Sequence, residues 1–105
     1  MSDRKIRYKY NGMGITISGH SGTYDHLPIP SKIDGRPVTR IGTGAFSHCQ
    51  SLNSVIIPCT VNIIGRNAFA HCPNLQEVNI PDGVRNIDRS AFEGCSSLEK
   101  VNIAV

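Results

Sequence analysis

Residues 38–60 read VTRIGTGAFSHCQSLNSVIIPCT, and the next 23 residues, 61–83, read VNIIGRNAFAHCPNLQEVNIPDG. The two stretches are identical at 11 of 23 positions, and residues 84–105, VRNIDRSAFEGCSSLEKVNIAV, continue the pattern. The apolar positions persist from unit to unit, whereas most polar positions change. A fixed period of this length predicts a solenoid, in which each turn, or rung, buries the same inward side chains against its neighbours.

The periodicity changes from segment to segment within each unit. Residues 55–57, 78–80 and 101–103 alternate with the two-residue period of a strand and carry β-branched residues inward, so we expect them to stack as a parallel ladder. Residues 61–64 predict a second short extended stretch. Residues 68–75 space their apolar side chains by three, which favours a short helical or 3₁₀ turn.

The repeat V-x-x-I-x-x-x-A-F-x-x-C-x-x-L-x-x-V-x-I-P closely resembles the BspA-type leucine-rich repeats, a family found largely in bacterial surface proteins. The resemblance covers residues 38–103 as three units, and residues 29–38 look like that family's entry into its first unit. It implies a leucine-rich-repeat solenoid of the α/β class, rich in β structure, with no catalytic site. It also implies a binding role in adhesion or host contact and a secreted or cell-surface location, although residues 1–5 lack the apolar core of a signal peptide.

The chain is 105 residues long, which fits one domain with two parts. We expect residues 1–26 to form an N-terminal β-hairpin cap and residues 27–105 to form the solenoid. In the cap, apolar and basic residues alternate over residues 5–10, and Asn11-Gly12 is a hairpin turn signal. The last rung, residues 98–103, is expected to lack a cap, so end-to-end stacking of copies as a structural unit is the alternative function.

The solvent-facing positions of the predicted ladder are the leading candidates for binding. They point to a non-enzymatic module that recognises protein or glycan in an adhesion-like role. The candidate residues are Ser54, Ile56, Glu77, Asn79, Lys100 and Asn102.

An alternative binding surface is a basic stripe, which we expect on the loop and turn side of the rungs. It would meet an acidic protein, a glycan or nucleic acid. Nucleic acid is disfavoured because no aromatic residues are interleaved for base stacking, and the net charge of +3 is too slight to require a polyanion. The stripe comprises Arg40, Arg66, Arg85 and Arg89.

Three of the four cysteines recur at one repeat position, which predicts a column of buried, reduced thiols at Cys49, Cys72 and Cys95. Cys59 breaks the pattern and is expected to be exposed. His48 and His71 each directly precede a cysteine of this column. Histidine and cysteine are the ligand types that zinc prefers. Neighbouring side chains in a helical turn diverge by about 100°, so the histidines should face solvent. We therefore expect no metal, no cofactor and no Cys-His nucleophile, and no apolar run is long enough for a membrane span.

Overall fold

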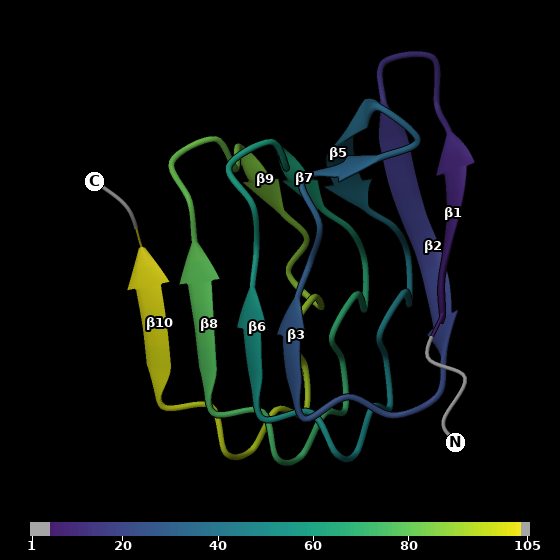
Figure 1. Ribbon diagram of the computed structural model, residues 1–105. Helices are drawn as coiled ribbons and strands as arrows, with labels where there is room; N and C mark the ends of the chain where they lie inside the picture. Colours follow the sequence, from purple (N-terminus) through teal and green to yellow (C-terminus); the bar gives the residue numbers. More distant parts are fainter. Residues whose placement is uncertain (1–4, 104–105) are drawn as a thin grey trace.

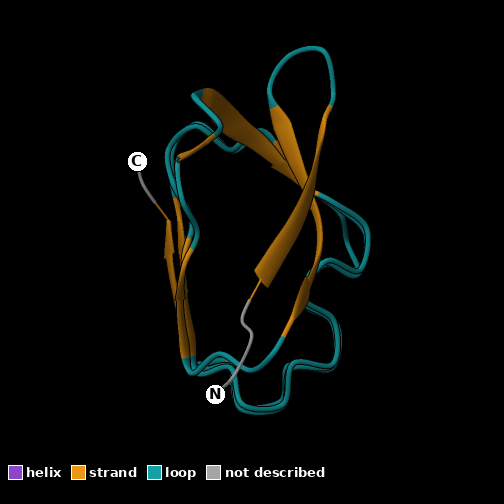
Figure 2. Ribbon diagram, turned by 45° about the vertical axis from the view of Figure 1, so that its right-hand side comes forward, coloured by secondary structure: helices purple, strands orange, loops and turns teal. Residues whose placement is uncertain are grey.

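The structure, a computed structural model, describes residues 5–103. Over this range the chain forms ten strands and no helix, so no helix that could cross a membrane is present there. The strands are β1 Lys5–Tyr10, β2 Ile15–Ser21, β3 His26–Pro28, β4 Lys32–Ile33, β5 Arg36–Ile41, β6 Ser54–Ile56, β7 Ile63–Ile64, β8 Glu77–Ile80, β9 Asn86–Ile87 and β10 Lys100–Ile103. They make two sheets, which Figure 2 shows as opposite walls of one coil joined by stacked loops.

The four-stranded sheet confirms the predicted ladder. Its strands lie in the order β10-β8-β6-β3, and all three pairings are parallel (Figure 1). Val55 pairs with Val78, which pairs with Val101, so the register repeats the 23-residue period of the sequence. β3 extends the ladder by one strand before the first full repeat, because Leu27 pairs in register with Val55.

The six-stranded sheet has the order β1-β2-β5-β7-β9, with β4 paired to β5. β1 and β2 form the predicted hairpin, with an irregularity in register between Arg7 and Tyr8. β2 also pairs in parallel with β5, so it occupies the place of a rung strand while β1 continues the sheet beyond it. The Tyr8 hydroxyl donates a 2.7 Å hydrogen bond to Asp34, which raises the pKa of Tyr8 and ties the hairpin to the β4–β5 turn.

The core is built from columns of identical side chains. Phe46 stacks on Phe69 with ring centroids 5.5 Å apart, and Phe69 stacks on Phe92 at 5.4 Å. His20 of β2 extends the stack at 5.1 Å from Phe46, with its Nδ1 3.0 Å from the Ala45 carbonyl oxygen. This stack keeps the rungs in phase and continues into the hairpin.

The segments predicted as helical or 3₁₀ turns fold as separate turns instead. Each turn is closed by a single hydrogen bond from residue i+3 to residue i, as from Ala45 to Gly42. A residue in the left-handed region interrupts each segment, because positive φ reverses the path that a helix would follow. At one repeat position the φ angles are 61° for His48, 59° for His71 and 74° for Gly94.

The last rung is more exposed than its predecessors. Phe92 and Leu98 are half-buried, whereas their equivalents one rung earlier are fully buried. Val101 is 46% exposed and Ile103 68%. Among residues 5–103, β10 has β8 as its one strand partner, so the apolar side chains of this rung are covered from one direction.

Candidate functional site

The outer face of the four-stranded sheet is formed by two rows that cross all four strands. Because residues paired in register share a face, the period that stacks the buried valines also aligns the positions on either side of them. One row is His26, Ser54, Glu77 and Lys100, and the other is Pro28, Ile56, Asn79 and Asn102.

Polar side chains on this face are hydrogen-bonded to one another, one pair within a row and one pair between the two rows. His26 Nδ1 lies 2.6 Å from Ser54 Oγ. Asn102 Nδ2 donates a 3.1 Å hydrogen bond to Glu77 Oε2. These contacts hold the side chains in place, so less conformational entropy would be lost if a partner bound over them.

Asn79 differs from the other candidates because its amide reaches the backbone of the preceding rung. Its Oδ1 accepts a 2.7 Å hydrogen bond from the Ile57 amide, and its Nδ2 donates a 3.1 Å bond to the Ile57 carbonyl. Ile57 is buried. Asn79 therefore satisfies two backbone groups just past the end of β6, and its side chain is half-buried as a result.

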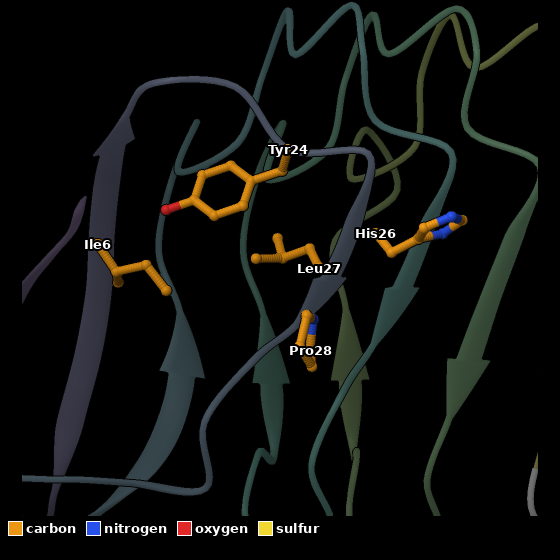
Figure 3. Close-up of a pocket in the computed structure, with 5 residues that line it drawn as sticks. All are labelled: Ile6, Tyr24, His26, Leu27 and Pro28. Atoms are coloured by element: carbon orange, nitrogen blue, oxygen red, sulfur yellow. The ribbon is translucent and has the colours of Figure 1, made fainter. Parts of the chain in front are cut away.

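The most exposed apolar side chain of the face is Ile56, at 60%. One strand away, at the sheet edge, lies a cavity of about 410 Å³ lined by Ile6, Tyr24, His26, Leu27 and Pro28. Figure 3 shows Tyr24 and Leu27 turned toward Ile6 of β1, while His26 points the other way. The sequence gives no signal for this cavity, because Ile6 of β1 and Leu27 of β3 belong to different sheets and meet only through tertiary packing.

The arginines of the alternative stripe occupy two kinds of position. Arg40 lies in β5 rather than in a loop, whereas Arg66 and Arg89 follow β7 and β9 in equivalent loops. Arg85 immediately precedes β9. All four are exposed, and within residues 5–103 none of them makes an ion pair.

The cysteine and histidine columns face opposite ways, as predicted. Cys49 and Cys72 are buried free thiols, and Cys59 is exposed. Burial raises the pKa of the Cys72 thiol to about 12, and its Sγ donates a 3.2 Å hydrogen bond to the Phe46 carbonyl. Cys95 is only partly buried, because it lies in the more exposed last rung.

His48 and His71 are exposed and stack on each other, with ring centroids 4.9 Å apart. His71 Nε2 lies 3.8 Å from a Glu93 carboxylate oxygen. Within residues 5–103, no group of three or more His, Cys, Asp or Glu side chains is arranged to hold a metal ion.

Comparison with protein families gives one match. A family model described as the BspA type leucine rich repeat region (6 copies) matches residues 24–105. No match was found among curated protein sequences.

Solved structures with the same fold come from several bacteria. A leucine rich repeat protein of T. pallidum superposes with a TM-score of 0.88 and 38% identity, over 91% of this chain and 46% of that one. A leucine-rich repeat protein from Bacteroides ovatus superposes with a TM-score of 0.78 and 29% identity, over 96% of this chain and 28% of that one. A leucine-rich repeat protein from Bacteroides capillosus superposes with a TM-score of 0.67 and 21% identity, over 100% of this chain and 96% of that one. The chain thus spans less than half the length of the first two.

Proposed function

The chain belongs to the BspA-type leucine-rich repeat family, and from this we propose that it is a non-enzymatic module that recognises protein partners through the outer face of its four-stranded sheet. Repeat proteins commonly bind through side chains that successive rungs hold in fixed rows. The proposed contact residues are Ser54, Ile56, Glu77, Asn79, Lys100 and Asn102, with the edge cavity beside β3 as their continuation.

The observation that carries the proposal is the combination of Ile56 with the edge cavity. Protein interfaces concentrate their binding energy in a few apolar anchors that fill pockets, surrounded by polar contacts. Pro28 lines the cavity and pairs in register with Ile56, so the two features are neighbours on one surface. Glu77, Lys100 and Asn102 supply the polar rim.

Asn79 has a supporting role in this proposal. Its amide is occupied by the Ile57 backbone, so it shapes the surface beside Ile56 more than it offers hydrogen bonds to a partner. Ile56 should therefore matter more for binding than its neighbour in the same row.

The test compares two isoleucines that face outward on opposite sheets, Ile56 of β6 and Ile63 of β7. Wild-type chain, Ile56→Asp and Ile63→Asp are immobilised, and the proteins retained from an extracellular-matrix extract, first freed of acidic polysaccharide by enzymatic digestion, are identified by mass spectrometry. We expect partners that are lost with Ile56→Asp and kept with Ile63→Asp. Equal retention by both variants, or loss with Ile63→Asp alone, would contradict the proposed face.

A second candidate function is end-to-end association between copies, which the exposure of Val101 and Ile103 favours. The edge of β10 would pair with another copy. Light scattering over a concentration series should then show growing mass for the wild type and none for Val101→Lys. A constant monomer mass at all concentrations would rule this candidate out.

A further inference from the structure

The outer side of the six-stranded sheet is basic. On β1, Lys5, Arg7 and Lys9 alternate with Ile6, Tyr8 and Tyr10. The second set lies on the side of the cavity and of the β4–β5 hairpin, because Ile6 lines the cavity, Tyr8 bonds Asp34 and the Tyr10 ring lies under Arg36. Lys5, Arg7 and Lys9 therefore project to the outside. Together with Arg40 of β5 and Arg85 at the start of β9 they form what we call the basic face.

Strand pairing brings these cations together from distant parts of the sequence. Lys9 pairs with Thr16, Thr16 with Arg40, Arg40 with Ile63, and Ile63 with Asn86, which makes one continuous row across β1, β2, β5, β7 and β9. In order along the row stand a cation, a hydroxyl, a second cation, an apolar side chain and an amide. Neighbouring members are separated by the strand spacing of about 4.8 Å.

Among residues 5–103, the cations of the basic face form no ion pair. The one ion pair found among residues 5–103 is His71 with Glu93, which lies elsewhere. Of the carboxylates beside these strands, Asp34 accepts the hydrogen bond of the Tyr8 hydroxyl, and Asp88, one residue past β9, accepts a hydrogen bond from the Ser90 amide through its Oδ1. Arg7 is held flat, because its guanidinium group occupies the space that a side chain on Gly19 would need.

A groove of about 340 Å³ opens on this side of the sheet, beside the tip of the β1–β2 hairpin. Its lining combines amides and a hydroxyl, one cation and two apolar side chains, and the volume lies in the range of small-ligand sites. Met13 is 84% exposed at its rim. The lining residues are Asn11, Met13, Thr39, Arg40, Asn62 and Ile63.

We propose that the basic face binds a linear acidic polysaccharide, with one carboxylated or sulfated sugar seated in this groove. Arg40 would hold the acidic group, because the guanidinium fork matches a carboxylate or sulfate with two hydrogen bonds. Asn62 would contact the sugar hydroxyls, and Met13 and Ile63 the apolar face of the ring. The remaining cations would contact acidic groups further along the chain.

The chemistry favours a polysaccharide over other polyanions. The exposed tyrosines of β1 alternate with its cations, and both are already engaged, Tyr8 by Asp34 and Tyr10 by Arg36, so neither offers a free ring on which a nucleic-acid base would stack. Within residues 5–103, no helix is available to enter a duplex groove. Anchoring to an anionic membrane commonly adds apolar insertion to electrostatic attraction. Here Met13 is the one large apolar side chain of the face that is strongly exposed.

The test measures binding of a defined heparin oligosaccharide, a linear sulfated polysaccharide, by titration calorimetry at several salt concentrations. Lys9→Gln should weaken binding about two- to five-fold, whereas Lys32→Gln, which removes an equal charge from an exposed lysine of β4, should leave it unchanged. Arg40→Gln should weaken binding about ten-fold and Arg40→Lys less, because lysine keeps the charge but not the fork.

Three outcomes would overturn the proposal. The first is the absence of heparin binding at physiological salt. The second is an equal loss with Lys9→Gln and Lys32→Gln, which would show that net charge alone attracts the polymer. The third is tighter binding to short duplex DNA or to phosphatidylserine vesicles than to the oligosaccharide, which would assign the face to a different class of partner.

Discussion

Replacing Asn79 by alanine removes both hydrogen bonds that the side chain makes with Ile57, at 2.7 and 3.1 Å. Ile57 is 2% exposed, so water has little access to replace them. A buried polar group left without a partner costs about 1–3 kcal/mol, and two such groups give an expected loss of about 2–6 kcal/mol in the free energy of unfolding. Domains of this size are stable by about 5–15 kcal/mol in total, so the variant should fold but be clearly weakened.

Asn102 provides the matched control, because it occupies the same repeat position one rung later. Its amide bonds the exposed Glu77 carboxylate at 3.1 Å, and no backbone group depends on it in the contacts of residues 5–103. Asn102→Ala should therefore change stability by no more than about 0.5 kcal/mol. Urea denaturation followed by circular dichroism measures both variants. Equal losses for the two, or a loss below about 1 kcal/mol for Asn79→Ala, would refute the argument.

Three further predictions concern the core. Phe69→Ala should lower the free energy of unfolding by about 3–5 kcal/mol, because this ring is fully buried between two others. Phe92→Ala should lower it by less than half as much, because Phe92 is half-buried, and equal losses in urea denaturation would count against the stacked column. A thiol reagent should modify Cys59 rapidly in the native protein and Cys72 only after denaturation, and peptide mapping by mass spectrometry would show any early modification of Cys72. The pKa of Cys72 is higher in the folded chain than its ordinary value near 9, so its contribution to stability is complete below pH 9 and is lost as the pH rises toward 12; Cys72→Ala should remove that part of the alkaline slope.

The repeat in the sequence was sufficient to predict which side chains form the buried columns. A period of 23 fixes the phase of every rung, so one inward cysteine implies the others, and the same phase sends His48 and His71 to solvent. The parallel ladder followed for the same reason. Phase, however, says nothing about turn conformation. The left-handed backbone at His48 and His71 is a local property that Gly94, at the equivalent position, could have signalled.

The candidate site was less predictable, because its properties depend on contacts between rungs. Periodicity assigned Ile56 and Asn79 to one outward row, but it could not show that an amide at this position reaches back to the Ile57 backbone while an isoleucine cannot. Periodicity assigned Arg40 and Arg85 to a basic stripe, but it could not join them to the cations of the hairpin. Lys9 and Arg40 are brought to either side of Thr16, which pairs with Lys9 in an antiparallel register and with Arg40 in a parallel one.

The two sheets place the proposed surfaces on opposite walls of one core, so the two surfaces should bind their partners independently. The core columns are fixed by packing, so each rung varies mainly at its outward positions, and one rung contributes Ile56 to one wall and Ile63 to the other. Substitutions at these exposed or half-exposed positions should not be transmitted through the buried residues between them. Ile56→Asp should therefore leave heparin affinity unchanged, and Lys9→Gln should leave protein capture unchanged. If either variant impaired both, the two walls would share one binding surface, and the separation of protein recognition from polysaccharide recognition would fail.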